Sequence, residues 1–108
     1  MATPKEIFEQ KIHGDIQKDP AKAKSINAIY QFTVTGPNGG DWTINLKDAP
    51  GVTAGKAEKP GCTVTVGDAD FVSIVEGKLN AQQAFMSGKL KIAGDMSLAM
   101  KLGQVLKG

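Results

Sequence analysis

The chain offers few side chains for catalysis, because its 108 residues include one histidine and one cysteine. In a helical pattern His13 falls opposite the apolar face, which predicts a solvated side chain. Cys62 falls on the apolar face of a predicted strand, where a buried and unreactive thiol is the usual outcome. A Ser-His-Asp or Cys-His site would have to use His13, and no residue near it in sequence supports that role. An enzyme remains possible on these residues alone, but none of them stands out as catalytic.

The sequence also lacks the residue patterns that metal and nucleotide sites require. One histidine and one cysteine cannot supply the four ligands of a structural zinc site. Asp68-Ala69-Asp70 resembles the start of a calcium loop, but Ser73 stands where that loop needs glycine and Leu79 where it needs glutamate. The glycines between residues 36 and 40 lack the Gly-x-Gly-x-x-Gly spacing of a dinucleotide site. We therefore expect no metal and no cofactor, and we interpret these residues as helix caps and a turn.

The basic residues argue against a nucleic-acid partner, and the apolar segments and cysteine count indicate the cellular compartment. The net charge is +2 and all thirteen basic residues are lysine. A specific nucleic-acid binder without arginine is improbable, because arginine supplies the bidentate contacts to phosphate and guanine. No apolar run is long enough to span a membrane, and the N-terminus lacks the apolar stretch of a signal peptide. With a single cysteine, these features predict a cytoplasmic protein that binds no nucleic acid.

The residue pattern predicts one domain over residues 1–108 with helices at its start. Thr3-Pro4-Lys5-Glu6 is a capping box with proline at the first helical position, and the helix is expected to reach about Lys18. Asp19-Pro20 begins a second, short helix by the same logic. The apolar residues expected to be buried by the first helix are Ile7, Phe8, Ile12 and Ile16.

Alternating segments then predict a sheet. Strands are expected over residues 28–35, 41–47, 52–56, 62–66 and 89–93, and the turn at 36–40 joins the first two as a hairpin. Asp68 and Asn80 are expected to cap two short helices, and Asp95 caps a final helix from Met96 to about Lys107. The predicted fold class is α+β: a five-stranded, largely antiparallel sheet with helices against one face.

The final helix is more apolar than a surface helix requires. At 100° per residue its apolar side chains occupy an arc of roughly 220°, whereas a core-facing stripe needs little more than about 100°. The helix is therefore a central core element, a subunit interface, or the wall of an apolar cavity. Methionine adapts to contents of varying shape, which favours the cavity somewhat. The pattern alone leaves all three open. The residues that could line such a cavity are Phe71, Phe85, Met86, Met96 and Met100.

Several stretches together resemble one known family. They are Trp42-Thr43-Ile44-Asn45-Leu46-Lys47, Asp68-Ala69-Asp70-Phe71 with Gly77-Lys78-Leu79-Asn80, Ala84-Phe85-Met86-Ser87-Gly88-Lys89-Leu90-Lys91-Ile92, Gly94-Asp95-Met96 and Leu98-Ala99-Met100-Lys101-Leu102. In this order and spacing the chain is similar, over nearly its whole length, to the sterol carrier protein type 2 family. This chain has Asp95 where the family often has asparagine, and it does not end in the Ser-Lys-Leu peroxisomal address of many eukaryotic members.

The resemblance implies a five-stranded sheet covered on one face by about five helices, with a hydrophobic tunnel between them. It implies a noncatalytic carrier that binds fatty acids, fatty acyl-CoA, sterols or phospholipids. Transient contact with membranes or lipid-metabolising enzymes, and a monomeric state, are also expected. The alternative is an interaction module that docks or dimerises through the final helix, and the alternative location is the peroxisome if a targeting tail has been removed. By position the expected lining comprises Trp42, Ile44, Phe71, Val75, Phe85, Met86, Met96, Met100 and Leu102.

Overall fold

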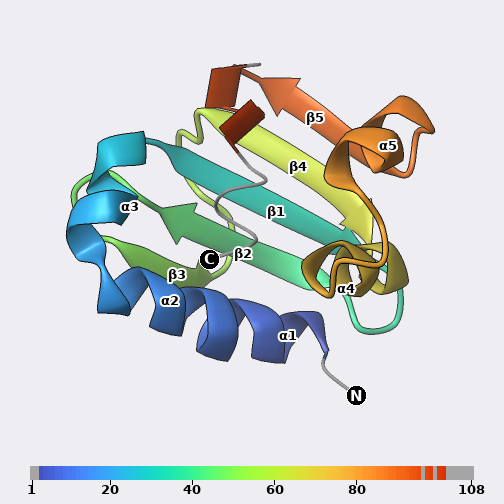
Figure 1. The fold of residues 1–108 in the computed structure, drawn as a ribbon, viewed down its shortest axis with the longest axis horizontal. Helices are drawn as coiled ribbons and strands as arrows, with labels where there is room; N and C mark the ends of the chain where they lie inside the picture. The colour runs from blue at the N-terminus through green and yellow to red at the C-terminus, as the bar shows by residue number, and fades with distance from the viewer. Residues whose placement is uncertain (1–2, 96, 99, 102–108) are drawn as a thin grey trace.

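The sheet has five strands in the order β3-β2-β1-β4-β5 (Figure 1). The computed structural model describes residues 3–95, 97–98 and 100–101. Every neighbouring pair of strands is antiparallel except β1 and β4, which run parallel. This confirms the predicted α+β class and the largely antiparallel sheet. The strands are β1 Ile29–Thr35, β2 Gly40–Asn45, β3 Gly51–Ala54, β4 Cys62–Gly67 and β5 Leu90–Gly94.

The helices lie against one face of the sheet (Figure 1). A continuous helical rod crosses the sheet at its β3 side, and α4 and α5 follow β4 in the chain. Residues 97–98 and 100–101, after β5, are also helical, and the rest of the predicted final helix lies outside the described residues. The rod consists of α1 Pro4–Glu6, the π-helical segment η1 Ile7–Ile12 and α2 His13–Lys18; the other helices are α3 Pro20–Ile26, α4 Asp68–Val75 and α5 Ala81–Met86.

Three of the predicted helix caps are confirmed. The Thr3 hydroxyl accepts a hydrogen bond from the Glu6 amide at 3.3 Å. The Asp19 carboxylate accepts one from the Lys22 amide at 3.1 Å. The Asn80 side chain accepts from the amides of residues 82 and 83. Each bond satisfies an amide that the first turn of a helix leaves without a partner.

The predicted cap at Asp68 is wrong, because the helix already includes this residue and Gly67 takes the cap position. The Asp68 carboxylate instead accepts hydrogen bonds from the Ala69 amide at 2.8 Å and the Asn38 amide at 3.1 Å. Asn38 lies in the turn between β1 and β2, so Asp68 joins that turn to the start of α4. A partner thirty positions away in the sequence is invisible to local capping rules.

The first helix also differs from the prediction, because its middle is π-helical and not α-helical. The i→i+5 bonding of a π-helix brings Ile7 and Ile12, five residues apart, toward the same side. Both are at most 3% exposed. The wider turn thus buries apolar side chains that an α-helix would spread over a broader arc.

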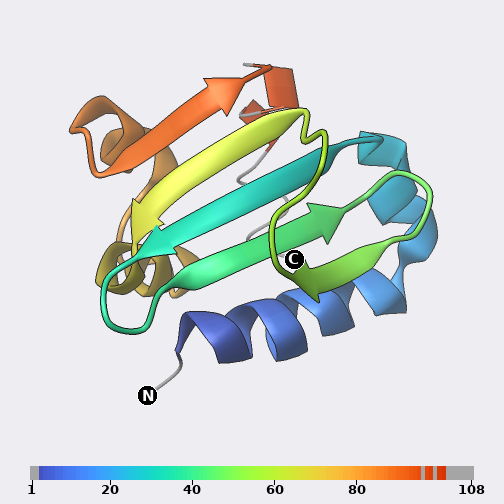
Figure 2. The same ribbon diagram turned by 180° about the vertical axis from the view of Figure 1, so that it is seen from behind.

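The two faces of the sheet differ in character. Figure 2 shows the face of the sheet away from the helices. The strand register places Gln31 and the threonines of β1, β2 and β4 on this face. There the Gln31 side-chain oxygen accepts a hydrogen bond from the Ala57 amide at 2.9 Å, which holds the β3–β4 connection against this face. The helix-side face is apolar, and its buried side chains include Tyr30, Phe32, Val34, Trp42, Ile44, Cys62, Val64, Val66 and Leu90.

Candidate functional site

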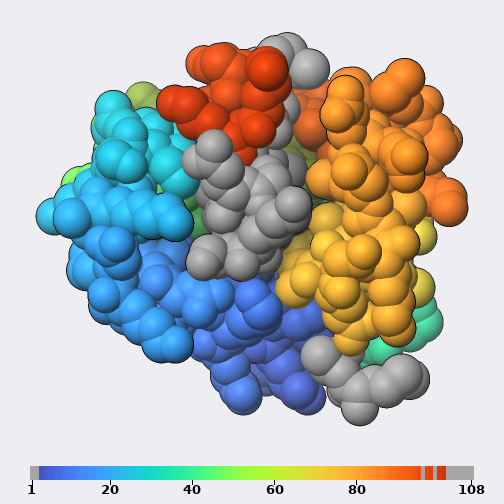
Figure 3. All heavy atoms as spheres, viewed as in Figure 1, coloured from blue at the N-terminus to red at the C-terminus, as the bar shows by residue number. Residues whose placement is uncertain are grey.

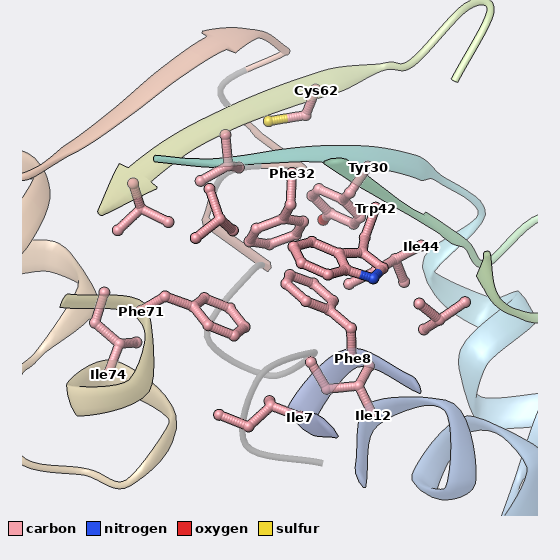
Figure 4. Close-up of a cluster of buried hydrophobic side chains, with 14 of the residues drawn as sticks. Ile7, Phe8, Ile12, Tyr30, Phe32, Trp42, Ile44, Cys62, Phe71 and Ile74 are labelled. Carbon is pink, nitrogen blue, oxygen red and sulfur yellow. The ribbon is translucent and has the colours of Figure 1, made fainter. Parts of the chain in front are cut away.

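Four rings pack tightly between the first helix and the sheet. In this aromatic cluster, comprising Phe8, Phe32, Trp42 and Phe71, the Phe8 ring stacks on Trp42 at 4.7 Å and on Phe71 at 4.5 Å between centroids (Figure 4). The Phe32 ring meets Phe8 edge-on at 5.1 Å. The Trp42 indole nitrogen donates a hydrogen bond to the Glu9 carboxylate at 3.1 Å. The cluster is closed, since no member is more than 5% exposed.

A second set of apolar side chains is packed less completely. We call it the half-buried group, because its members pack against the core while keeping part of their surface exposed. All of them follow Gly67 in the chain; Ile26, on α3, is also partly buried against the core but lies before it. The group comprises Val72, Val75, Leu79, Ala81, Ile92 and Leu98. A further apolar molecule could cover the apolar surface that these side chains leave exposed.

The elements around this group are fixed by buried neighbours. Ala84, which is 0% exposed, holds α5 against the core. Leu90 pairs with Val66 and Ile92 pairs with Val64, so β5 presents its two large apolar side chains to the helix side. The half-buried side chains therefore project from anchored helices and from the sheet.

The segment after β5 is fastened to the sheet by polar contacts. The Tyr30 hydroxyl donates a hydrogen bond to the Leu98 carbonyl oxygen at 2.5 Å. The Asp95 carboxylate accepts from the Ser97 amide at 2.9 Å, as expected of a cap. At Gly94, where φ is +111°, a Cβ atom would lie 2.5 Å from the Gly61 carbonyl oxygen, so this close turn requires glycine. These bonds hold Leu98, a member of the half-buried group, against the sheet near Tyr30.

Burial near this anchor changes two ionisable groups. The pKa of Tyr30 is raised to about 12, first by burial and then by the charges of Cys62 and Asp95. Burial, followed by the Asp95 charge, also raises the pKa of the Cys62 thiol. A protonated, buried thiol is a poor nucleophile. The predicted burial of Cys62 is confirmed.

The structure distributes the nine expected lining residues over three environments. Trp42, Ile44 and Phe71 are buried in or beside the aromatic cluster, and Val75 belongs to the half-buried group. Met96 and Leu102 lie outside the described residues. The other three are at the surface, with exposed fractions of 39% for Phe85, 78% for Met86 and 85% for Met100.

Of the half-buried group, the expected lining includes Val75 and omits the other five members. Sequence reasoning also missed the anchor at Tyr30, which lies in the predicted strand 28–35 and whose hydroxyl finds its partner 68 positions away. The alternation of β5 indicates that the Ile92 side chain faces the helices, but its partial exposure has no sequence signal.

The predicted solvation of His13 is wrong. The side chain is half-buried, and its Nδ1 atom accepts a hydrogen bond from the Val52 amide at 3.0 Å. The Gln17 side chain donates to the Pro50 carbonyl oxygen at 2.7 Å in the same area. His13 therefore joins the first helix to the edge strand β3, a structural role.

Within the described residues, no three histidine, cysteine, aspartate or glutamate side chains form a group suited to a metal ion. Over the same part of the chain, no helix has the length and apolarity needed to cross a bilayer.

The sequence matches the model of the SCP-2 sterol transfer family over residues 7–107. The chain belongs to this family. The matched residues include all four rings of the aromatic cluster and every member of the half-buried group.

Two relatives support this membership. The chain is 46% identical over 101 residues to peroxisomal multifunctional enzyme A of Dictyostelium discoideum, a match that covers 90% of this chain and 23% of the relative. It is 45% identical over 83 residues to sterol carrier protein 2 of Homo sapiens, covering 73% of this chain and 15% of the relative. The chain thus spans less than a quarter of either relative.

Solved structures share the fold along almost the whole chain. The sterol carrier protein domain 2 of Helicoverpa armigera superposes with a TM-score of 0.76 at 39% identity, covering 98% of this chain and 91% of that one. The palmitated SCP2L2 of Aedes aegypti superposes with a TM-score of 0.77 at 28% identity, covering 95% of this chain and 94% of that one.

Proposed function

We propose that this chain is a noncatalytic carrier that binds a fatty acid, a fatty acyl-CoA or a sterol and transfers or presents it. The half-buried group carries the proposal, because its aliphatic side chains leave apolar surface exposed beside the core. Membership of the sterol transfer family and the palmitated state of an Aedes aegypti relative support a lipid as the occupant. The lone, buried Cys62 suits a reducing compartment such as the cytoplasm.

We place the apolar part of the ligand between α4, α5 and β5, in contact with Val75, Leu79 and Ile92. These three side chains are only partly buried, so a ligand can cover them without displacing the core. Insertion into the aromatic cluster would instead separate rings whose centroids lie 4.5–5.9 Å apart. In this proposal Trp42, Ile44 and Phe71 form the rigid wall behind the site and do not touch the ligand.

Apolar burial alone supplies enough free energy for binding. Burying one methylene group contributes about 0.8 kcal/mol, so a chain of about fifteen contributes roughly 12 kcal/mol before costs. Association and ordering take back at least several kcal/mol. Because apolar burial has no direction, the proposed carrier accepts several acyl lengths and ring systems.

The first experiment is native mass spectrometry of the purified protein, with organic extraction of any bound molecule. We expect adducts with the masses of fatty acids or other lipids, or a 1:1 adduct once palmitate is added. A protein that carries no lipid and fails to bind added palmitate or palmitoyl-CoA would contradict the proposal.

A second candidate function is an interaction module, and the exposure of Phe85, Met86 and Met100 favours it. It predicts a stable oligomer or a protein complex that does not depend on lipid. Light scattering at several protein concentrations, with and without palmitate, separates the two functions. A lipid-binding monomer supports the carrier.

A further inference from the structure

The turn between β1 and β2 contains the dipeptide Asn38-Gly39, which the proposed carrier site does not use. Both residues are exposed, and Figure 3 shows the turn, in blue-green, at the surface beside α4 at the lower right. Asn38 is held by its main chain, because its backbone amide donates a hydrogen bond to the Asp68 carboxylate at 3.1 Å. Its exposed side-chain amide can still rotate toward the main chain that follows it.

The packing of this turn requires a glycine directly after Asn38. A Cβ atom at Gly39 would overlap the Val34 carbonyl oxygen, so no residue with a side chain fits there. The missing side chain also leaves the Gly39 amide nitrogen unshielded. The geometry that forms the hairpin therefore places an exposed asparagine amide next to an accessible main-chain nitrogen.

We infer that Asn38 is a site of spontaneous deamidation through a cyclic imide. Hydroxide takes the proton of the Gly39 amide, and the nitrogen attacks the carbonyl carbon of the Asn38 side chain. A carbon–nitrogen bond forms, the bond to the side-chain nitrogen breaks, and that nitrogen takes a proton from water and leaves as ammonia. Water then opens the ring at one of its two carbonyl groups, which leaves aspartate or isoaspartate. No oxidant or reductant is needed.

Two hydrogen bonds restrain this reaction in the folded protein. The Gly39 amide donates to the Gly36 carbonyl oxygen at 3.0 Å, and the Asn38 amide donates to Asp68. The turn must therefore open before the Gly39 nitrogen can attack. Local opening of exposed turns costs little free energy, since few buried contacts hold them. Asp68 slows the reaction by keeping the turn closed.

The products weaken the contact between the turn and α4. Aspartate places a second negative charge beside the Asp68 carboxylate, and like charges repel. Isoaspartate also inserts an additional carbon into the main chain before Gly39, where the turn has no room beside Val34. In both forms the bond to Asp68 is weakened or lost, so deamidation loosens the start of α4 from the hairpin.

The test is incubation of the full chain in mildly alkaline buffer at body temperature, followed by peptide mass mapping and labelling with an isoaspartate-specific methyltransferase. Asn38 should gain the mass difference between an amide and an acid. Its conversion should exceed that of Asn45 and Asn80 by about tenfold, because reactive geometry controls the rates of intramolecular reactions. The side chains of these two internal controls are hydrogen-bonded, and a residue with a side chain follows each of them.

Three variants show whether the turn governs the reaction. Asn38→Gln keeps an amide but lengthens the side chain, which disfavours ring closure, so conversion at this position should be lost. Asp68→Ala frees the turn and should speed conversion of Asn38 about fivefold, the factor expected for the loss of one hydrogen bond. Asp70→Ala removes the other acidic residue in the first turn of α4 and should leave the rate unchanged.

The isoaspartate form can be separated by ion exchange, because it carries an added negative charge. Its equilibrium constant for unfolding in urea should be about fivefold larger than that of the original protein. Equal stability of the two forms would overturn the anchoring role of the Asp68 contact. Conversion at Asn38 no faster than at Asn45 and Asn80, or an undiminished gain of negative charge in Asn38→Gln, would overturn the modification site itself. Palmitate affinity enters none of these measurements, so failure of the carrier function leaves the inference standing.

Discussion

The aromatic cluster and the half-buried group lie against the same face of one sheet, yet they are packed differently. In the cluster, rings from the first helix, β1, β2 and α4 meet at centroid distances of 4.5–5.9 Å and exclude solvent. In the half-buried group, aliphatic side chains from α4 to Leu98 retain exposed surface. The aromatic rings are closed to solvent, whereas the aliphatic side chains leave apolar surface that a ligand would cover in the proposed carrier. The same face of the sheet thus carries a closed aromatic cluster and a more exposed aliphatic group.

The sharpest way to break this comparison is to remove the central ring of the aromatic cluster. Phe8→Ala should reduce the free energy of unfolding by about 3–5 kcal/mol, because a fully buried ring is lost and a cavity remains. The matched control, Phe85→Ala, removes the same ring from a 39% exposed site and should cost far less. Urea unfolding measures both. Equal losses would show that the two regions are not packed differently.

The anchor between the sheet and the last described segment predicts a pH dependence. The pKa of Tyr30 is raised from 10.0 to about 12 in the folded protein, so the unfolded chain loses this proton first as the pH rises. The contribution of Tyr30 is therefore complete below pH 10.0 and is lost between pH 10.0 and about 12. The slope is roughly 1.4 kcal/mol per pH unit.

Tyr30→Phe provides the reference for this measurement, because lysines also titrate near this pH. Thermal or urea unfolding of both proteins should show a steeper alkaline loss for the original. Parallel curves would mean that the phenol is not desolvated as the structure indicates.

Blocking the half-buried group should reduce ligand binding more than folding. Ile92→Trp adds bulk to the helix side of β5 and should weaken palmitate binding about tenfold, which is the scale of overpacking an apolar site. Lys91→Trp places the same side chain on the opposite face of the same strand and should leave binding unchanged. Calorimetric titration measures both variants. Equal affinities in a folded Ile92→Trp protein would remove Ile92 from the site.

The smallest expected effect is the loss of the hydrogen bond between Trp42 and Glu9 at the edge of the aromatic cluster. Glu9→Ala removes the acceptor of the Trp42 indole and should cost about 1 kcal/mol of stability. The Trp42 emission should also change, because its hydrogen bond is lost. Glu6→Ala, one turn earlier and also exposed, is the control. An unchanged emission spectrum would contradict the indole–carboxylate bond.

Much of the fold could be predicted because its signals are local. The caps at Thr3, Asp19 and Asn80 and the alternation of the five strands each depend on neighbouring residues. The parallel pairing of β1 with β4 could not be predicted, since it depends on which segments meet after folding. The contacts of Asp68 with Asn38 and of His13 with Val52 were missed for the same reason.

The site was harder to predict than the fold. Apolar residues on helices were all plausible lining residues, and the pattern could not separate Phe71, which is buried, from Met86, which is exposed. Their difference depends on how the short helices α4 and α5 are rotated against the sheet. The partial exposure of Val75 and Ile92 depends on how the elements pack together and has no counterpart in composition or spacing.

The most direct test of the central claim is a palmitate titration followed by amide chemical shifts of the isotopically labelled protein. We expect saturable changes at α4, α5 and β5, centred on Val75, Leu79 and Ile92, with small changes at Phe8 and Trp42. Changes centred on the aromatic cluster, or no binding at all, would contradict it.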